Sequence, residues 1–142
     1  MHLRLTLFVV ALVGLLALSA CGGNPAAAAM PLPAELDNAS AEVREAYQYA
    51  MANHAELAKY PCYCGCVDLG HTSNRDCYID EILEDGTIKL DYHAVACDIC
   101  GDITRDVARL RDQGFASVAI REYIDTKYSP YGPSTNTPFP ME

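Results

Sequence analysis

Three cysteines crowd into the run PCYCGC at residues 61–66. Alternate side chains of a flat strand share a face but stand about 6.6 Å apart. Thiolates bound to one tetrahedral metal ion at about 2.3 Å lie only about 3.8 Å from each other. The three sulfur atoms therefore converge only if the chain bends. Pro61 and Gly65 flank Cys64 and permit such a bend, so this run predicts a folded loop that presents thiolates.

The N-terminal segment predicts export. Residues 1–20 combine a basic residue with a long apolar run and small residues, which is typical of a secretory signal peptide. The run Leu18-Ser19-Ala20-Cys21 resembles the lipobox of bacterial lipoproteins. That resemblance implies diacylation of Cys21 with chains such as palmitate, which would anchor the protein to the cell membrane on the extracytoplasmic side. A cleaved, freely secreted protein is the alternative, and the choice between inner and outer membrane stays open.

The charge of the chain excludes one class of partner. The formal net charge is −9, and removal of residues 1–20 leaves nine basic and nineteen acidic side chains, a net charge of −10. A nucleic-acid-binding protein needs a basic face, so we expect no nucleic acid partner. An acidic surface attracts cations instead.

The periodicity of the chain predicts an α+β fold that is mainly α, a small cysteine-rich domain of about three helices with a short β-hairpin. We expect a first helix from an N-cap at Ser40 to Pro61, and a hairpin that turns at Asp85-Gly86. A second helix is expected from about His93 to Gly114, and a third begins at an N-cap on Ser117.

The expected domain organisation has four parts. Residues 1–20 form the lipoprotein signal peptide, and residues 21–37 form the lipidated cysteine and a flexible tether rich in Ala, Gly and Pro. Residues 38–128 form the cysteine-rich metal-binding domain. Residues 129–142 form a Pro-rich irregular tail. So small a core needs covalent or metal cross-links to hold it.

Other cysteines and histidines follow the hexapeptide in a regular order: Gly70-His71, Cys77, His93 and Cys97-x-x-Cys100. With the hexapeptide, this order resembles the PCYCGC-motif family of bacterial lipoproteins from the first helix through the last. That family has no assigned activity, so the resemblance implies an extracytoplasmic lipoprotein and leaves the chemistry to be inferred from the residues.

The spacing of these residues predicts a metal site. His93, Cys97 and Cys100 stand at i, i+4 and i+7, which is one face of a helix that starts early enough. Eight candidate ligands result, enough for two separate four-coordinate sites or for one cluster with bridging sulfur. They are Cys62, Cys64, Cys66, His71, Cys77, His93, Cys97 and Cys100.

Soft sulfur donors select Cu(I) or Zn(II) over metals that prefer oxygen. Copper is the first expectation, because the short Cys spacings suit the low coordination number of Cu(I) and bacterial copper traffic runs largely outside the cytoplasm. We therefore expect a protein that binds, buffers or transfers a copper or zinc ion. Its partners would be the metal ion, the membrane, and a metal-trafficking or membrane protein.

Two other interpretations stay open. Six cysteines outside the cytoplasm are also typical of three disulfides in a structural module, and His71 and His93 are then ordinary imidazoles. A thiol-disulfide oxidoreductase that uses Cys97 and Cys100 is the only enzyme class in play. Gly101 stands where a c-type haem motif needs histidine, and catalysis is otherwise not indicated. The sequence does not specify the metal stoichiometry or the oligomeric state.

Overall fold

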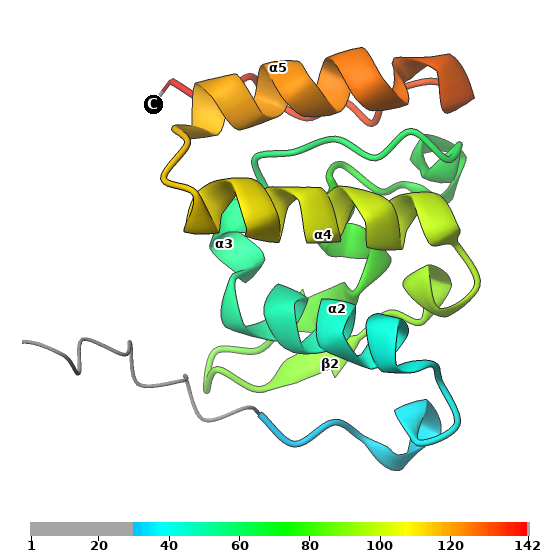
Figure 1. The fold of residues 1–142 in the computed structure, drawn as a ribbon. Coiled ribbons are helices and arrows are strands. Elements are labelled where there is room, and N and C mark those ends of the chain that lie inside the picture. The colour runs from blue at the N-terminus through cyan, green and yellow to red at the C-terminus, as the bar shows by residue number, and fades with distance from the viewer. Residues whose placement is uncertain (1–29, 142) are drawn as a thin grey trace, which may run out of the picture.

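Three stacked helices form the frame of the domain (Figure 1). The computed structural model describes residues 30–141, so the expected signal peptide and Cys21 lie outside the described residues. Helix α4 (Asp98–Asp112) lies between α2 (Ala41–Ala52) and α5 (Ser117–Tyr128) and packs against both. Because it is covered on two sides, α4 buries Ile103, Val107 and most of Leu110. No helix in the described part of the chain is long and apolar enough to cross a membrane.

A two-stranded antiparallel hairpin completes the fold, which is α+β and mainly α as predicted. Strand β1 (Ile79–Ile82) pairs with β2 (Ile88–Leu90). Gly86 has a φ of +86°, which an L residue adopts only with strain, and this explains the tight turn after Asp85. Short 3-10 helices fill the connections: η1 (Ala34–Leu36), η2 (Cys66–Leu69), η3 (Asn74–Cys77), η4 (His93–Val95) and η5 (Ser129–Tyr131).

The first expected helix is interrupted. Ser40 is its N-cap as predicted, since the Ser40 hydroxyl accepts a hydrogen bond from the Val43 N–H at 3.2 Å. The expectation of one helix up to Pro61 was wrong, because Asn53 leaves the helical conformation and a second short helix, α3 (His54–Leu57), follows. The Asn53 side-chain amide donates to the Tyr49 carbonyl at 3.0 Å and so satisfies the end of α2.

The helix that carries Cys97 and Cys100 begins later than predicted. His93 lies in η4, and α4 starts at Asp98 with Cys97 as its extended N-cap. The Asp91 carboxylate accepts the His93 N–H at 2.6 Å and starts a separate turn there. Gly114, with a φ of +83°, follows the end of α4 as expected.

The cap of the last helix was also predicted one residue too late. Ala116 is the N-cap of α5, and Ser117 is its first residue. The Ser117 hydroxyl donates to Glu56 at 3.3 Å instead of capping the helix, because α3 packs close to this end of α5.

The chain after α5 packs on the domain. Residues 132–141, named here the C-terminal strap, contain no helix or strand and run back beside α5 (Figure 1). The Arg121 guanidinium on α5 donates to the carbonyls of Thr137 and Pro138, both at 3.1 Å. The buried Thr135 hydroxyl accepts a hydrogen bond from Cys62 in the PCYCGC run, and the buried Thr137 hydroxyl donates to the Thr72 carbonyl that follows η2. The strap therefore contacts the chain on both sides of η2.

Candidate metal centre

The PCYCGC run, residues 61–66, is a bent loop that we name the hook. Gly65 has a φ of +84°, the left-handed conformation that the sequence predicted for a sharp bend. Tyr63 reaches α5, where its hydroxyl donates to Asp125 at 2.7 Å. The C-terminal strap holds the hook from the other end of the chain: the Cys62 N–H donates to the Thr135 hydroxyl, and the Thr135 N–H donates to the Cys62 carbonyl, both at 3.0 Å.

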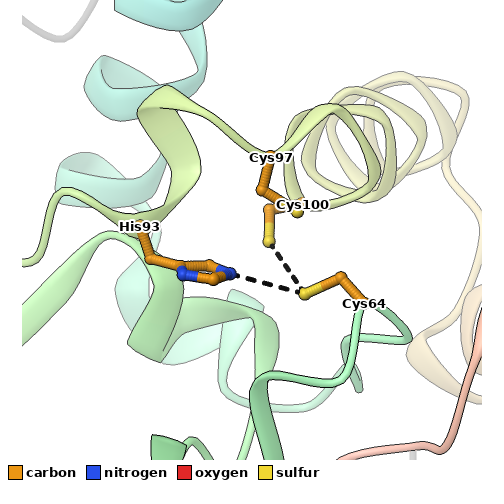
Figure 2. A group of neighbouring side chains, drawn as sticks. All are labelled: Cys64, His93, Cys97 and Cys100. Atoms are coloured by element: carbon orange, nitrogen blue, oxygen red, sulfur yellow. Dashed lines mark hydrogen bonds between the residues drawn. The ribbon is translucent and has the colours of Figure 1, made fainter.

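The bend brings Cys64 against the start of α4 (Figure 2). The Cys64 Sγ lies 3.7 Å from the Cys100 Sγ and 3.5 Å from the His93 Nε2. With Cys97, these donors form a first group in which all ligand atoms lie within 4.8 Å of one another. The spacing fits a single tetrahedral ion, for which sulfur ligands stand about 3.8 Å apart.

A second group of donors lies where η2 meets η3. The Cys77 Sγ is 3.8 Å from the Cys66 Sγ and 3.5 Å from the His71 Nδ1, and all three atoms lie within 4.8 Å of one another. Gly70, with a φ of +88°, ends η2 and turns the chain so that His71 faces Cys77. Gly65 and Gly70 thus bend the chain on either side of η2.

Cys62 lies between the two groups. Its Sγ is 3.4 Å from both the Cys64 and the Cys100 sulfurs, and it shares 4.8 Å neighbourhoods with Cys66 and Cys77. The structure therefore brings together all eight donors that the sequence singled out, in one continuous cluster. Their role as metal ligands remains a prediction.

The described cysteines carry no disulfide bond. The shortest sulfur separation among the hydrogen-bonded pairs, 3.4 Å, far exceeds the 2.05 Å of a disulfide. Cys62, Cys77 and Cys100 are fully buried, and Cys66 is 1% exposed, while Cys64 and Cys97 are half-buried. The cluster is therefore a set of close free thiols inside the core.

Hydrogen bonding within the cluster divides five of the six thiols into two kinds. The hydrogen bond with Cys100 is the main cause that lowers the pKa of Cys62 to about 4 and the pKa of Cys64 well below its usual range. Hydrogen bonds among the sulfurs raise the pKa of Cys66, Cys77 and Cys100. Without metal, thiol protons are shared between closely spaced sulfurs, and a soft cation would take their place.

Asn74 positions the start of α4 and is a residue that the sequence did not single out. Its buried side-chain amide donates to the Cys100 carbonyl at 3.2 Å, and its oxygen accepts from the Thr104 hydroxyl at 2.7 Å. Its N–H donates to the Tyr60 carbonyl, just before the hook, at 2.8 Å. One side chain in η3 thus joins the hook to α4, and no local pattern distinguishes it from other polar loop residues.

The cluster approaches the surface at two hollows. One is lined by Cys97 together with Ser40, Asp98 and Gly101, between the first turns of α2 and α4. The other is lined by His71 with acidic side chains that include Asp76, Asp80 and Asp91. Each group of donors therefore has a member that lines a surface hollow.

The fold and the cluster define a class: a small, mainly helical domain with a cysteine and histidine cluster that could hold a metal ion. The chain belongs to the family described as proteins of unknown function with the PCYCGC motif, whose profile matches residues 20–140. The resemblance drawn from the hexapeptide is thereby confirmed. No curated protein and no solved structure matches the chain.

Proposed function

We propose that this protein binds Cu(I) on the extracytoplasmic side of a membrane and buffers it or transfers it to another protein. The observation that carries the proposal is the first donor group, in which Cys64, His93, Cys97 and Cys100 present ligand atoms within 4.8 Å of one another. Three sulfurs and one imidazole nitrogen form a soft donor set, which Cu(I) and Zn(II) prefer and which Mg(II) and Ca(II) do not.

Exposure favours a transported ion over a purely structural one. Structural zinc sites are closed, with four protein ligands shielded from solvent. Here Cys97 is half-buried beside one hollow, and His71 lines the other. Ligand exchange with a partner protein requires such accessible ligands. A zinc ion that stabilises the fold is the second candidate, because the sulfur spacing of 3.7 to 3.8 Å also suits tetrahedral zinc.

The membrane anchor is proposed from the sequence. Cys21 follows a signal-like segment, and two acyl chains on it would anchor the protein durably, at about 0.8 kcal/mol for each buried methylene. The residues that follow would act as a tether, and the packed domain begins by η1, where Leu36 is fully buried. The copper partner would then be another extracytoplasmic or membrane protein.

Binding rather than catalysis is the proposed role of the cysteines. The rival is a dithiol enzyme in which Cys97 and Cys100 alternate between thiol and disulfide. In the first donor group both sulfurs share their neighbourhood with Cys64 and His93, a set that a two-cysteine redox mechanism does not require.

One anaerobic preparation tests these alternatives. The full chain is expressed with its own N-terminal segment and purified in detergent from bacterial membranes, and its metal content and free thiols are counted on the same sample. We expect bound copper, six protected thiolates, and Cu(I) binding that survives competition with a chromophoric Cu(I) chelator. Metal-free protein with three disulfides would refute the proposal. A single reversible Cys97–Cys100 bridge with mixed disulfides trapped in Cys100→Ser would support the enzyme instead.

Two matched histidine variants test the metal site, and one cysteine variant tests the anchor. His93→Gln removes a donor of the first group and should weaken Cu(I) binding. His54→Gln changes a half-buried histidine on α3 that belongs to neither donor group and should bind as the wild type does. Cys21→Ala should abolish incorporation of a labelled fatty acid without loss of metal binding by the folded domain.

A further inference from the structure

The number of donors exceeds what one ion can use. A tetrahedral ion takes four ligands, and Cu(I) accepts fewer. The first group already supplies four, from Cys64, His93, Cys97 and Cys100. The second group supplies three, from Cys66, His71 and Cys77. It lacks a fourth donor of its own.

Cys62 is the sulfur that can complete the second group. It shares 4.8 Å neighbourhoods with Cys66 and with Cys77. The Cys62 Sγ also lies 3.4 Å from each of the Cys64 and Cys100 sulfurs. Those two ligands of the first group lie 3.7 Å from each other, so Cys62 is closer to each of them than they are to one another. The same sulfur therefore lies within 4.8 Å of two sulfurs of each group.

We infer that the centre holds two metal ions joined by the Cys62 thiolate. This inference rests on the proposed metal-binding function and deepens it: one ion is bound by three donors of the first group, the other by the second group, and the Cys62 thiolate is the fourth ligand of both. The His71 and His93 rings, one from each group, lie edge to face with their centroids 5.4 Å apart.

Burial of the second group supports two ions over one. A single ion in the first group would leave three further sulfurs, Cys62, Cys66 and Cys77, in the core without a metal, each at most 1% exposed. A second ion would use these closely spaced sulfurs as ligands and displace their protons as it binds.

The two groups should fill in order. The first group is complete, and its ligands Cys64 and Cys97 are half-buried, so an incoming ion can reach it. The second group has four ligands only when Cys62 is counted with it. We therefore expect the first ion to bind to the four donors of the first group. The second ion should convert Cys62 to a bridge that takes the place of one of those four donors, so that both ions stay four-coordinate.

Cobalt(II) is a suitable probe, because it substitutes for Zn(II) at tetrahedral thiolate sites and is paramagnetic. The full-length protein in detergent is titrated anaerobically with Co(II), while thiolate charge-transfer absorption and the EPR signal are followed. We expect absorption to rise up to two equivalents. The EPR signal should grow during the first equivalent and fall during the second, since a thiolate bridge couples the two spins.

Two variants separate the bridge from its alternatives. Cys62→Ser should bind one ion, whose EPR signal remains at saturation. His71→Gln leaves Cys62 and the first group intact and should also reduce the stoichiometry from two to one, so the test does not depend on the folding of Cys62→Ser. Native mass spectrometry with Cu(I) should give at least two copper ions for the wild type, and fewer for each variant.

Three results would contradict the two-ion inference or the proposed function, and each has a different meaning. If the wild type binds only one Co(II) and one Cu(I), the two-ion inference is overturned while the proposed metal binding stands. If two Co(II) ions bind without magnetic coupling, the groups are separate and Cys62 is not a bridge. If neither metal binds to the reduced, folded protein, the proposed function itself fails.

Discussion

The Sγ atoms of Cys62 and Cys100 lie 3.4 Å apart, although 38 positions separate these residues along the chain. This contact joins the hook to the first turn of α4 in the centre of the core. A metal ion bound at this point would cross-link two segments that are otherwise held by hydrogen bonds and packing. Binding and folding of this domain should therefore be coupled.

Metal removal is expected to destabilise the protein. An ion present at 1,000 times its dissociation constant contributes about 4 kcal/mol. In a domain of this size, each kcal/mol shifts Tm by about 4 to 8 °C. A chelator should therefore lower Tm by more than about 10 °C in a thermal melt followed by circular dichroism, and added metal should restore it. An unchanged Tm in protein whose metal loss is confirmed would contradict the coupling.

Gly65→Ala should weaken metal binding. The φ of +84° at Gly65 costs an L residue about 1 to 2 kcal/mol, and a Cβ there would meet no atom within 4 Å, so the cost comes from the backbone alone. Relaxation of that strain would move Cys64 and Cys66 apart. Gly86→Ala is the control, because Gly86 has a φ of +86° and equal space in the distant hairpin. Both variants should lose similar stability in urea melts, while only Gly65→Ala should lose metal affinity.

Thr135→Val should loosen the hook. Valine keeps the shape of threonine but removes the hydroxyl that accepts the buried Cys62 N–H. An unpaired buried donor costs about 1 to 3 kcal/mol. Hydrogen exchange at the Cys62 amide should become faster, and the midpoint of urea unfolding should fall. Thr135→Ser retains the acceptor and should stay closer to the wild type; equal losses in the two variants would show that the methyl group matters and the hydroxyl does not.

Asn74→Asp should disturb the start of α4. The substitution replaces the amide that donates to the Cys100 carbonyl with a buried oxygen that cannot donate when ionised. We expect a loss of about 2 kcal/mol or more in unfolding free energy, and weaker metal binding. Asn53→Asp is the matched control, since that amide also donates to a backbone carbonyl but at the half-buried junction of α2 and α3. A variant at Asn74 that binds metal as tightly as the wild type would exclude this positioning role.

Asp106 should make stability dependent on pH. Burial raises the pKa of this carboxyl, but hydrogen bonds from Lys127, Arg109 and Tyr128 outweigh burial and lower it below its usual range. Because the pKa of Asp106 is lower in the folded state, its contribution to the free energy of unfolding is fully present above the unfolded-state pKa of about 3.9. That contribution is lost as the pH falls through the folded-state pKa.

Asp106→Asn measures that contribution. It should cost about 1 to 3 kcal/mol at pH 7, and its difference from the wild type should shrink as the pH falls below about 4. Asp102→Asn removes an exposed ion pair with Arg105 on the same helix and should change stability by less than about 1 kcal/mol. Urea melts at each pH check both variants. A difference that stays constant down to pH 2 would mean that the carboxylate charge plays no part.

Local chemistry made several features predictable. Ser40 caps α2, Gly86 turns the hairpin, and Gly114 follows the end of α4, because each depends on the backbone preferences of one residue and its neighbours. Gly65 bends the hook for the same reason. The start of α4 and the break at Asn53 were not predicted, because competing side-chain contacts from Asp91 and Asn53 itself decide them.

The sequence by itself determined that eight soft donors are present, that the hook must bend, and that the chain is a mainly helical domain with a short hairpin. Only the tertiary structure decided how those donors divide into two groups, that Cys62 lies between them, and that Asn74 and the C-terminal strap hold the hook. The physical reason is the distance along the chain between the residues that interact. Bends and caps depend on neighbouring residues. The contact of Cys62 with Cys100 and the hydrogen bond from the Cys62 N–H to the Thr135 hydroxyl arise only when α5 and the strap pack over the core.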